Sequence, residues 1–182
     1  LGRPAKAPIL PSDVQDAYHP RPMCKSSLNT VTPQAPSNFR DIMRSIGATV
    51  ALLTTCDEQG KLFGMAITGW TSLSFEPASV IIAVNQSASI HDVLLQANKF
   101  SLHLPALSDI HLIELFSRSD KRDERFAGDM WTTGDLGLPK LKTSLSSMFF
   151  TIDNSMRYGT HTLFSGRLHL SLIHNGRCRR ST

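Results

Sequence analysis

The sequence predicts a mainly β protein, an antiparallel barrel with a few peripheral helices. Several apolar runs rich in β-branched residues are bounded by turn residues, which is typical of short strands. Helical patterns lie between these runs at irregular intervals, so the chain lacks the repeating strand and helix rhythm of a parallel sheet. Its 182 residues suffice for a substantial core, and we expect one folded domain.

The folded part is predicted to begin with a short helix. Asn38 is a suitable N-cap, and Gly47 is a suitable terminator. Apolar residues recur between them at helical spacing, namely Phe39, Ile42, Met43 and Ile46. A hairpin follows, because the β-rich runs at 49–55 and 61–68 are separated by the turn sequence DEQG.

A strand and a capped helix are expected next. The continuous apolar run at 78–85 predicts a buried strand. Ser89, with Asp92 three residues later, forms a capping-box pattern, which predicts a helix in the segment SIHDVLLQANKF.

The rest of the chain is predicted to hold three strands and one more helix. The segment FSLHLPA reads as a strand, and SDIHLIELF as a capped helix whose core face would use Ile110, Ile113 and Leu115. From residue 145 onward, two apolar runs are joined by a turn around Tyr158 and Gly159, which predicts a final pair of strands.

Residues 1–37 are predicted to form a flexible, proline-rich arm that precedes the domain at 38–182. Seven of the ten prolines lie in residues 1–36. The formal charge of +4 also lies in the tails, since residues 38–170 hold 12 Lys and Arg against 13 Asp and Glu. A folded nucleic-acid binder carries its basic stripe on the domain, so nucleic acid is not a predicted partner.

Composition excludes several other classes of protein. No run approaches the roughly 18 apolar residues of a membrane-spanning helix, so no membrane association is predicted. The three cysteines, Cys24, Cys56 and Cys178, are widely spaced, which indicates neither a disulfide framework nor a zinc knuckle. The seven histidines show no ligand spacing, and no metal is predicted. A reducing, cytoplasmic location fits this cysteine usage.

Five motifs occur in the order found in the short-chain flavin reductases, the reductase components of two-component flavin monooxygenases. The motifs are FRDIMRSIGATVALLTT, GMAITGWTSLSFEP, NQSASIHDVLL, RFAGDMW and GTHTLFSGR. The chain therefore resembles this family over residues 38–177. The resemblance implies an FMN-binding split β-barrel, which is a Greek-key antiparallel barrel, and a homodimer.

The second motif is implied to lie along the edge of the flavin ring. A flavin carries its own redox chemistry, so the protein need supply only a flat apolar slot, hydrogen bonds to the polar edge and a phosphate anchor. The candidate residues are Thr68, Gly69, Trp70, Thr71 and Ser72, of which the first three replace the family's Asn, Ser and Phe. The alternative is that the hydroxyls satisfy themselves in a polar strand and that Trp70 is a core aromatic.

The third motif resembles the phosphate loop of the family and contains Ser87, Ala88 and Ser89. Unpaired N–H groups at the start of the following helix would favour an anion there. Ala88 stands where the family often has a basic residue, which implies dependence on Arg125 or another cation. The alternative is that Ser89 is only an N-cap.

The last two motifs supply the remaining candidates. Arg125, Phe126 and Gly128 match a loop that borders the flavin in the family; the alternative is that 121–125 is a solvated helix surface. His161 matches a histidine near the nicotinamide, where an imidazole can donate a hydrogen bond or a proton. Thr160 replaces the family's acidic residue, and the alternative is a structural histidine.

The resemblance implies an NAD(P)H-dependent flavin reductase. It would transfer hydride from NADH or NADPH to FMN, FAD or riboflavin and supply reduced flavin to a partner monooxygenase. The residues leave three alternatives open. One is a flavin-binding barrel with little turnover, and another is an enzyme like pyridoxamine-phosphate oxidase, which the lack of an Arg/Lys cluster disfavours. The third is nucleic-acid binding by the basic tails, which predicts strong salt dependence.

Overall fold

The computed structural model describes residues 36–173, and the segments 1–35 and 174–182 lie outside the described part. The described residues divide into two compact units, 36–46 and 47–173. Most of the predicted arm lies outside the described residues, so the boundary between residues 37 and 38 stays a prediction. No helix within the described residues is long and apolar enough to cross a membrane.

The first unit is a single helix, α1 (Pro36–Ser45). It begins two residues before the predicted cap, so the expectation that Asn38 is the N-cap is wrong. Pro36 suits the first helical position because its missing N–H has no intrahelical partner there and its φ is already helical. The predicted apolar residues Phe39, Ile42, Met43 and Ile46 are all between 50 and 67 % exposed.

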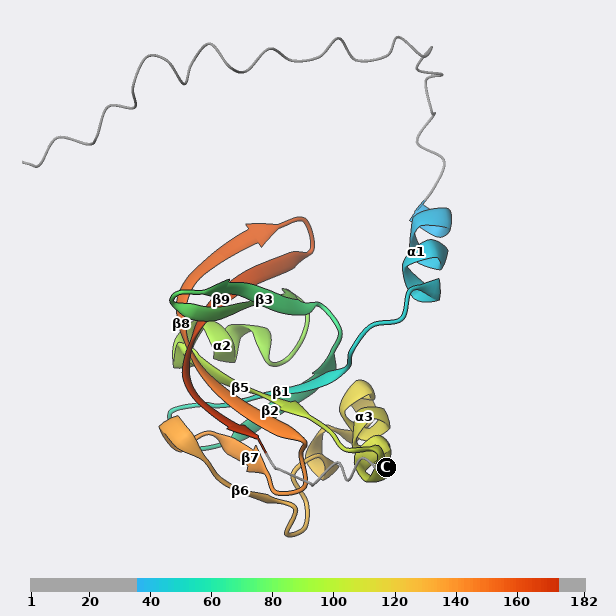
Figure 1. The fold of residues 1–182 in the computed structure, drawn as a ribbon. Helices are drawn as coiled ribbons and strands as arrows, with labels where there is room; N and C mark the ends of the chain where they lie inside the picture. The colour runs from blue at the N-terminus through green and yellow to red at the C-terminus, as the bar shows by residue number, and fades with distance from the viewer. Residues whose placement is uncertain (1–35, 174–182) are drawn as a thin grey trace, which may run out of the picture. The chain divides into compact units, whose positions relative to one another are not determined.

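The second unit is built on one antiparallel sheet with the strand order β2-β1-β5-β8-β9-β4-β3 (Figure 1). Its strands are β1 (Ala51–Cys56), β2 (Leu62–Ile67), β3 (Trp70–Phe75), β4 (Ala78–Asn85), β5 (Lys99–Leu104), β8 (Ser146–Tyr158) and β9 (His161–Ile173). A smaller sheet pairs β6 (Trp131–Thr133) with β7 (Pro139–Leu141). The predicted first hairpin, the strand at 78–85, the strand after residue 98 and the final strand pair are confirmed.

Two short α-helices of the described part accompany the sheet, α2 (His91–Ala97) and α3 (Ile110–Ser117). Three 3₁₀ helices of the same part lie at Leu107–Asp109, Ser119–Glu124 and Asp135–Gly137. The predicted core face of α3 is partly wrong, because Ile110 is 62 % exposed while Leu112 and Phe116 are buried. Leu112 and Phe116 are four residues apart and therefore share one face of the helix. They pack on Leu52 and Leu141, and this pairing rotates the helix away from the predicted face.

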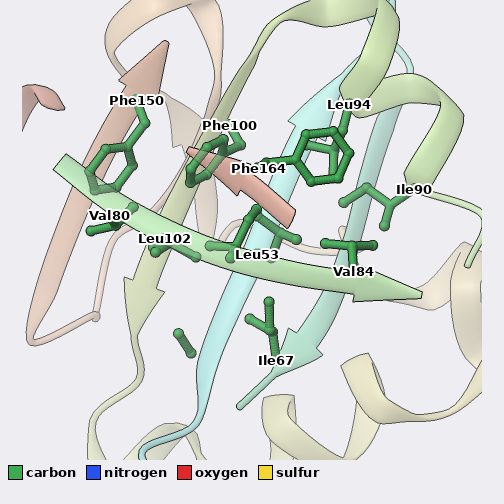
Figure 2. Packing of buried hydrophobic residues seen from close by; sticks show 12 residues of the cluster. Leu53, Ile67, Val80, Val84, Ile90, Leu94, Phe100, Leu102, Phe150 and Phe164 are labelled. Carbon is green, nitrogen blue, oxygen red and sulfur yellow. The ribbon is translucent and has the colours of Figure 1, made fainter. Parts of the chain in front are cut away.

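The large sheet curls around a common core. Ile67 of β2 and Val80 of β4 belong to one buried cluster, although their strands lie near opposite ends of the strand order. In a flat sheet these strands would be about 24 Å apart, given the usual spacing of neighbouring strands. Figure 2 shows the cluster, in which Phe100, Phe164 and Leu94 fill the space between the strands and α2. The structure thus confirms a mainly β, antiparallel, barrel-like architecture with few helices.

Packing explains why the last motif has a glycine at position 166. A Cβ atom at this position would lie 2.5 Å from the ring of Phe100. Phe100 stacks on Phe150 with 5.0 Å between ring centroids, so neither ring has room to move aside. The glycine in GTHTLFSGR is therefore required by packing across β5, β8 and β9.

Candidate functional site

A cavity of about 290 Å³ lies beside the outer edge of β2. Met65 and Ala66 of β2 line one side, and Ala88 and Ser89, from the loop between β4 and α2, line another. The turn that follows α3 contributes Arg122. The cavity therefore joins residues from the second, third and fourth motifs, which are far apart in the sequence.

The outer edge of β2 is open because β2 is the first strand in the order of the large sheet. Backbone groups on such an edge are not taken by a neighbouring strand, although Arg125 donates to the Gly64 carbonyl of β2. A Cβ atom at Gly64 would lie 2.6 Å from the Phe116 ring, which is too close for a side chain at this position. This glycine lets Phe116 of α3 approach the strand closely.

Asn85 shapes the loop that carries Ser87, Ala88 and Ser89. Its Oδ1 accepts hydrogen bonds of 2.9 Å from both the N–H and the hydroxyl of Ser87. Its carbonyl accepts a 3.0 Å hydrogen bond from the Ala88 N–H. The last residue of β4 thus holds the loop, and Ser89 lines the cavity.

The prediction that Ser89 caps α2 with Asp92 is wrong. The helix begins at His91, and the capping position, Ile90, makes no side-chain cap bond. Asp92 instead bonds the ring of His91 at 2.7 Å, and the other ring nitrogen of His91 lies 2.9 Å from the Thr162 hydroxyl. This buried contact with β9 fixes where the helix starts, so tertiary packing overrides the local capping pattern.

Two of the amides near the start of α2 already have main-chain partners, and the anion site at this helix stays a prediction. The N–H groups of Ala88 and His91 already bond the carbonyls of Asn85 and Ala88. Hydroxyls and guanidinium groups also line this cavity and could bind an anion. Ser89, Ser117 and Ser119 supply the hydroxyls, and Arg122 and Arg125 supply the cations.

Arg125 is buried, with 6 % of its surface exposed, and holds main-chain carbonyls. Its guanidinium donates to Gly64 O, to Arg118 O at 2.5 Å and to Leu115 O at 3.4 Å. Burial lowers the pKa of this guanidinium, and the neighbouring Arg122 lowers the pKa further. The side chain stays charged at neutral pH, and most of its donors serve the fold.

Arg122 is the exposed cation beside it. It lines the cavity, and its guanidinium has no hydrogen-bond or ion-pair partner within residues 36–173. The sequence interpretation passed over Arg122 because the charged run at 121–125 looks like a solvated surface. The pairing of its neighbours, Lys121 with Glu124 and Arg118 with Asp120, leaves Arg122 as the available cation of this turn.

Phe126 and Gly128 follow Arg125 in the same turn. The Phe126 ring packs against Phe116 and Trp131, with centroid distances of 5.5 and 5.1 Å. Phe126 also lines a second cavity beside the first. Gly128 has a φ of +82°, which a residue with a side chain rarely adopts, so its conformation explains this glycine.

Residues Thr68, Gly69, Trp70, Thr71 and Ser72 lie at the turn into β3 and along it, and none of them lines the cavity at β2. The Trp70 indole N–H donates a 3.1 Å hydrogen bond to the Thr49 carbonyl, and the ring packs against the main core. Trp70 therefore has a clear structural role. Thr71 and Ser72 are exposed.

His161 lies at the start of β9 and is exposed. Its Nδ1 atom is 2.9 Å from the Thr160 hydroxyl, which takes the place of the family's acidic residue. Its backbone pairs with Asn85, and its carbonyl accepts a 3.1 Å hydrogen bond from Gln86. The fold thus brings His161 close to the loop that holds Ser87, Ala88 and Ser89. In a single chain, however, His161 does not line the cavity at β2.

Some features of this cavity suit a flavin nucleotide, although the candidates at 68–72 and His161 lie outside it. An open strand edge, small side chains and the apolar Met65, Ile90 and Phe116 suit a flat ring, and hydroxyls with Arg122 suit a phosphate. Within the described residues, no group of three or more His, Cys, Asp and Glu side chains could hold a metal ion.

The chain is similar in sequence to known flavin reductases. Residues 43–176 match the model of the flavin reductase like domain. The chain is 33 % identical over 145 residues to the reductase component of the FADH(2)-dependent resorcinol hydroxylase of Rhizobium sp. (strain MTP-10005), covering 78 % of this chain and 80 % of that protein. It is 32 % identical over 127 residues to the FMN reductase (NADH) RutF of Klebsiella pneumoniae subsp. pneumoniae, covering 70 % and 77 %.

A solved structure shows the same fold. The styrene monooxygenase flavin reductase from Pseudomonas putida S12 superposes with a TM-score of 0.69 over 77 % of this chain and 88 % of that one. Its sequence is 24 % identical, so this likeness carries the fold alone.

Proposed function

Since the chain belongs to the flavin reductase like domain family, we propose that it is an NAD(P)H:flavin oxidoreductase that supplies reduced flavin to a partner oxygenase. The observation that carries the proposal is the cavity at the edge of β2. It combines Met65 and Ala66, from the β2 part of the second motif, with the loop at 87–89 and an available guanidinium. The proposed domain extends over residues 38–182.

When bound, the flavin supplies the redox chemistry, because it accepts hydride from the nicotinamide. The residues of the chain bind and orient the reactants. Backbone groups of β2 would bind the ring, and Ser89 and Arg122 would hold the phosphate. Ile90 and Phe116 keep water from the apolar side. Holding two reactants in register removes much of the entropic barrier.

An absorbance titration with FMN and FAD, followed by anaerobic addition of NADH or NADPH, tests this proposal. We expect binding and then bleaching of the flavin band. Ser89→Glu should weaken FMN binding at least about tenfold, because a carboxylate would replace a phosphate-facing hydroxyl. Ser171→Glu, on the exposed part of β9, is the matched control. Binding without bleaching would instead indicate a flavin-binding barrel without turnover, and absence of binding would refute the proposal.

A second copy of the chain is proposed to complete the site at His161. Tyr158 pairs directly with His161 and Met156 with Leu163, so these side chains share the outward face of the β8–β9 hairpin. Tyr158 is 78 % exposed and Met156 56 % exposed within a single chain. Hydrophobic side chains gathered on one exposed face suit an interface with a second copy.

Sedimentation velocity tests the dimer. We expect a species of twice the 20.1 kDa chain mass. Met156→Glu should shift the protein to the monomer, because a charge would be buried in the interface. Leu107→Glu is the matched control, since Leu107 is 86 % exposed and lies before α3. A wild-type protein that is monomeric at micromolar concentration would contradict the proposed interface.

A further inference from the structure

Two cavities adjoin along the open edge of β2. The first is the 290 Å³ cavity assigned above to the flavin and its phosphate. The second has a volume of about 370 Å³ and lies beside Lys61, Leu62 and Phe63, toward the start of β2. Both cavities are lined by Ser89, Ser119, Arg122 and Arg125, so these four residues form the junction between them.

The charged groups of the second cavity favour a phosphate at this junction. Arg122 lines both cavities, and Lys61 lines the second. Asp120 also lines the second cavity, but Arg118 neutralises it through bonds of 2.8 and 3.2 Å. Asp123 is the one further carboxylate among the described lining residues. Lys61 and Arg122 have no ion-pair partner within the described part of the chain.

The other side chains of the second cavity suit a flat base. Phe63 and Phe126 provide aromatic surface, on which a purine can stack. The Lys61 ammonium lies 5.5 Å from the centre of the Phe63 ring, so cation and aromatic surface are adjacent. Ser119 adds a hydroxyl beside them. Cations, hydroxyls and aromatic rings in one cavity are the combination that binds a nucleotide.

We propose that the second cavity binds an adenosine diphosphate group, and that this group belongs to FAD. FAD is favoured as its source because the cavity continues from the flavin cavity through Arg122, which would contact the diphosphate. The chain would then bind FAD more tightly than FMN. This inference rests on the proposed function, since it assumes a flavin in the first cavity.

Direct binding separates the two cavities. The protein without flavin is titrated by calorimetry with riboflavin, FMN and FAD. We expect FAD to bind about tenfold more tightly than FMN. Arg122→Gln should weaken both FMN and FAD about tenfold and leave riboflavin unchanged, because Arg122 contacts phosphate only. Lys61→Gln should weaken FAD about threefold and leave FMN unchanged. Lys142→Gln, an exposed lysine outside both cavities, is the control.

Each other outcome overturns a different claim. Equal affinity for FAD and FMN in the wild type, or an equal loss of both in Lys61→Gln, would refute the adenosine subsite and leave the flavin site standing. A raised KM for NADH in Lys61→Gln, measured with FMN and with FAD affinity unchanged, would assign the cavity to the nicotinamide dinucleotide. Failure of all three flavins to bind would refute the proposed function itself.

Discussion

Replacing Arg125 by methionine is expected to lower the free energy of unfolding by about 2–4 kcal/mol. The buried guanidinium donates to the carbonyls of Gly64, Arg118 and Leu115, which come from β2, from the turn after α3 and from α3. Methionine fills similar volume but leaves these carbonyls without a charged donor. A buried polar group that loses its partner retains the full penalty of its desolvation.

Chemical denaturation measures this loss. Arg122→Met is the control at the neighbouring exposed position and should change stability by less than about 0.5 kcal/mol. Arg125→Lys keeps the charge but cannot reach three carbonyls at once, so we expect an intermediate loss. If Arg125→Met were as stable as the wild type and had lost only flavin affinity, Arg125 would be a ligand-binding residue and its structural role would be refuted.

The strands could be predicted from the sequence because their signal is local. The run at 78–85 forms β4 as predicted. The sequence predicted a strand buried on both faces, but buried and half-buried residues alternate along it. The starts of the helices were less predictable. Ser89 and Asp92 form a good capping pattern, but the bond between His91 and Thr162 joins residues far apart in the sequence, and no local pattern shows it.

Part of the candidate site could be predicted from the sequence motifs, and part could not because it depends on non-local contacts. The order of the motifs placed Ala88, Ser89 and Arg125 near one another, and the structure brings all three to one cavity. The sequence did not show that Arg125 is structural while Arg122 is the available cation. This difference depends on which guanidinium reaches the carbonyl of Gly64. His161 remains outside the cavity of a single chain, since its place would depend on a second copy.

His103 is a buried histidine at the centre of a polar network. Its Nδ1 lies 2.9 Å from the Ser147 hydroxyl, and its Nε2 lies 3.2 Å from the hydroxyls of Thr54 and Ser101. Burial lowers its pKa to about 3; the nearby Lys140 also lowers it, while the Pro139 carbonyl opposes the shift. The ring is therefore neutral in the folded protein at every pH above about 4.

This shift makes the protein sensitive to acid. An unfolded histidine takes up a proton near pH 6.5, whereas the folded protein resists protonation down to about pH 3. Between these values the unfolded state binds one more proton, so the free energy of unfolding is highest above pH 6.5 and falls as the pH falls. The expected slope is about 1.4 kcal/mol per pH unit, which lowers stability by about 3 kcal/mol at pH 4.5.

Urea denaturation at a series of pH values between 7 and 4.5 measures this slope above the range in which most carboxylates titrate. His103→Gln should be less stable at pH 7, because an amide matches the network poorly, but its stability should depend much less on pH. His111→Gln, at an exposed position on α3, should keep the wild-type slope. If the slope persisted in His103→Gln, the proton would be taken up elsewhere, and the neutral imidazole would not be the source of the acid sensitivity.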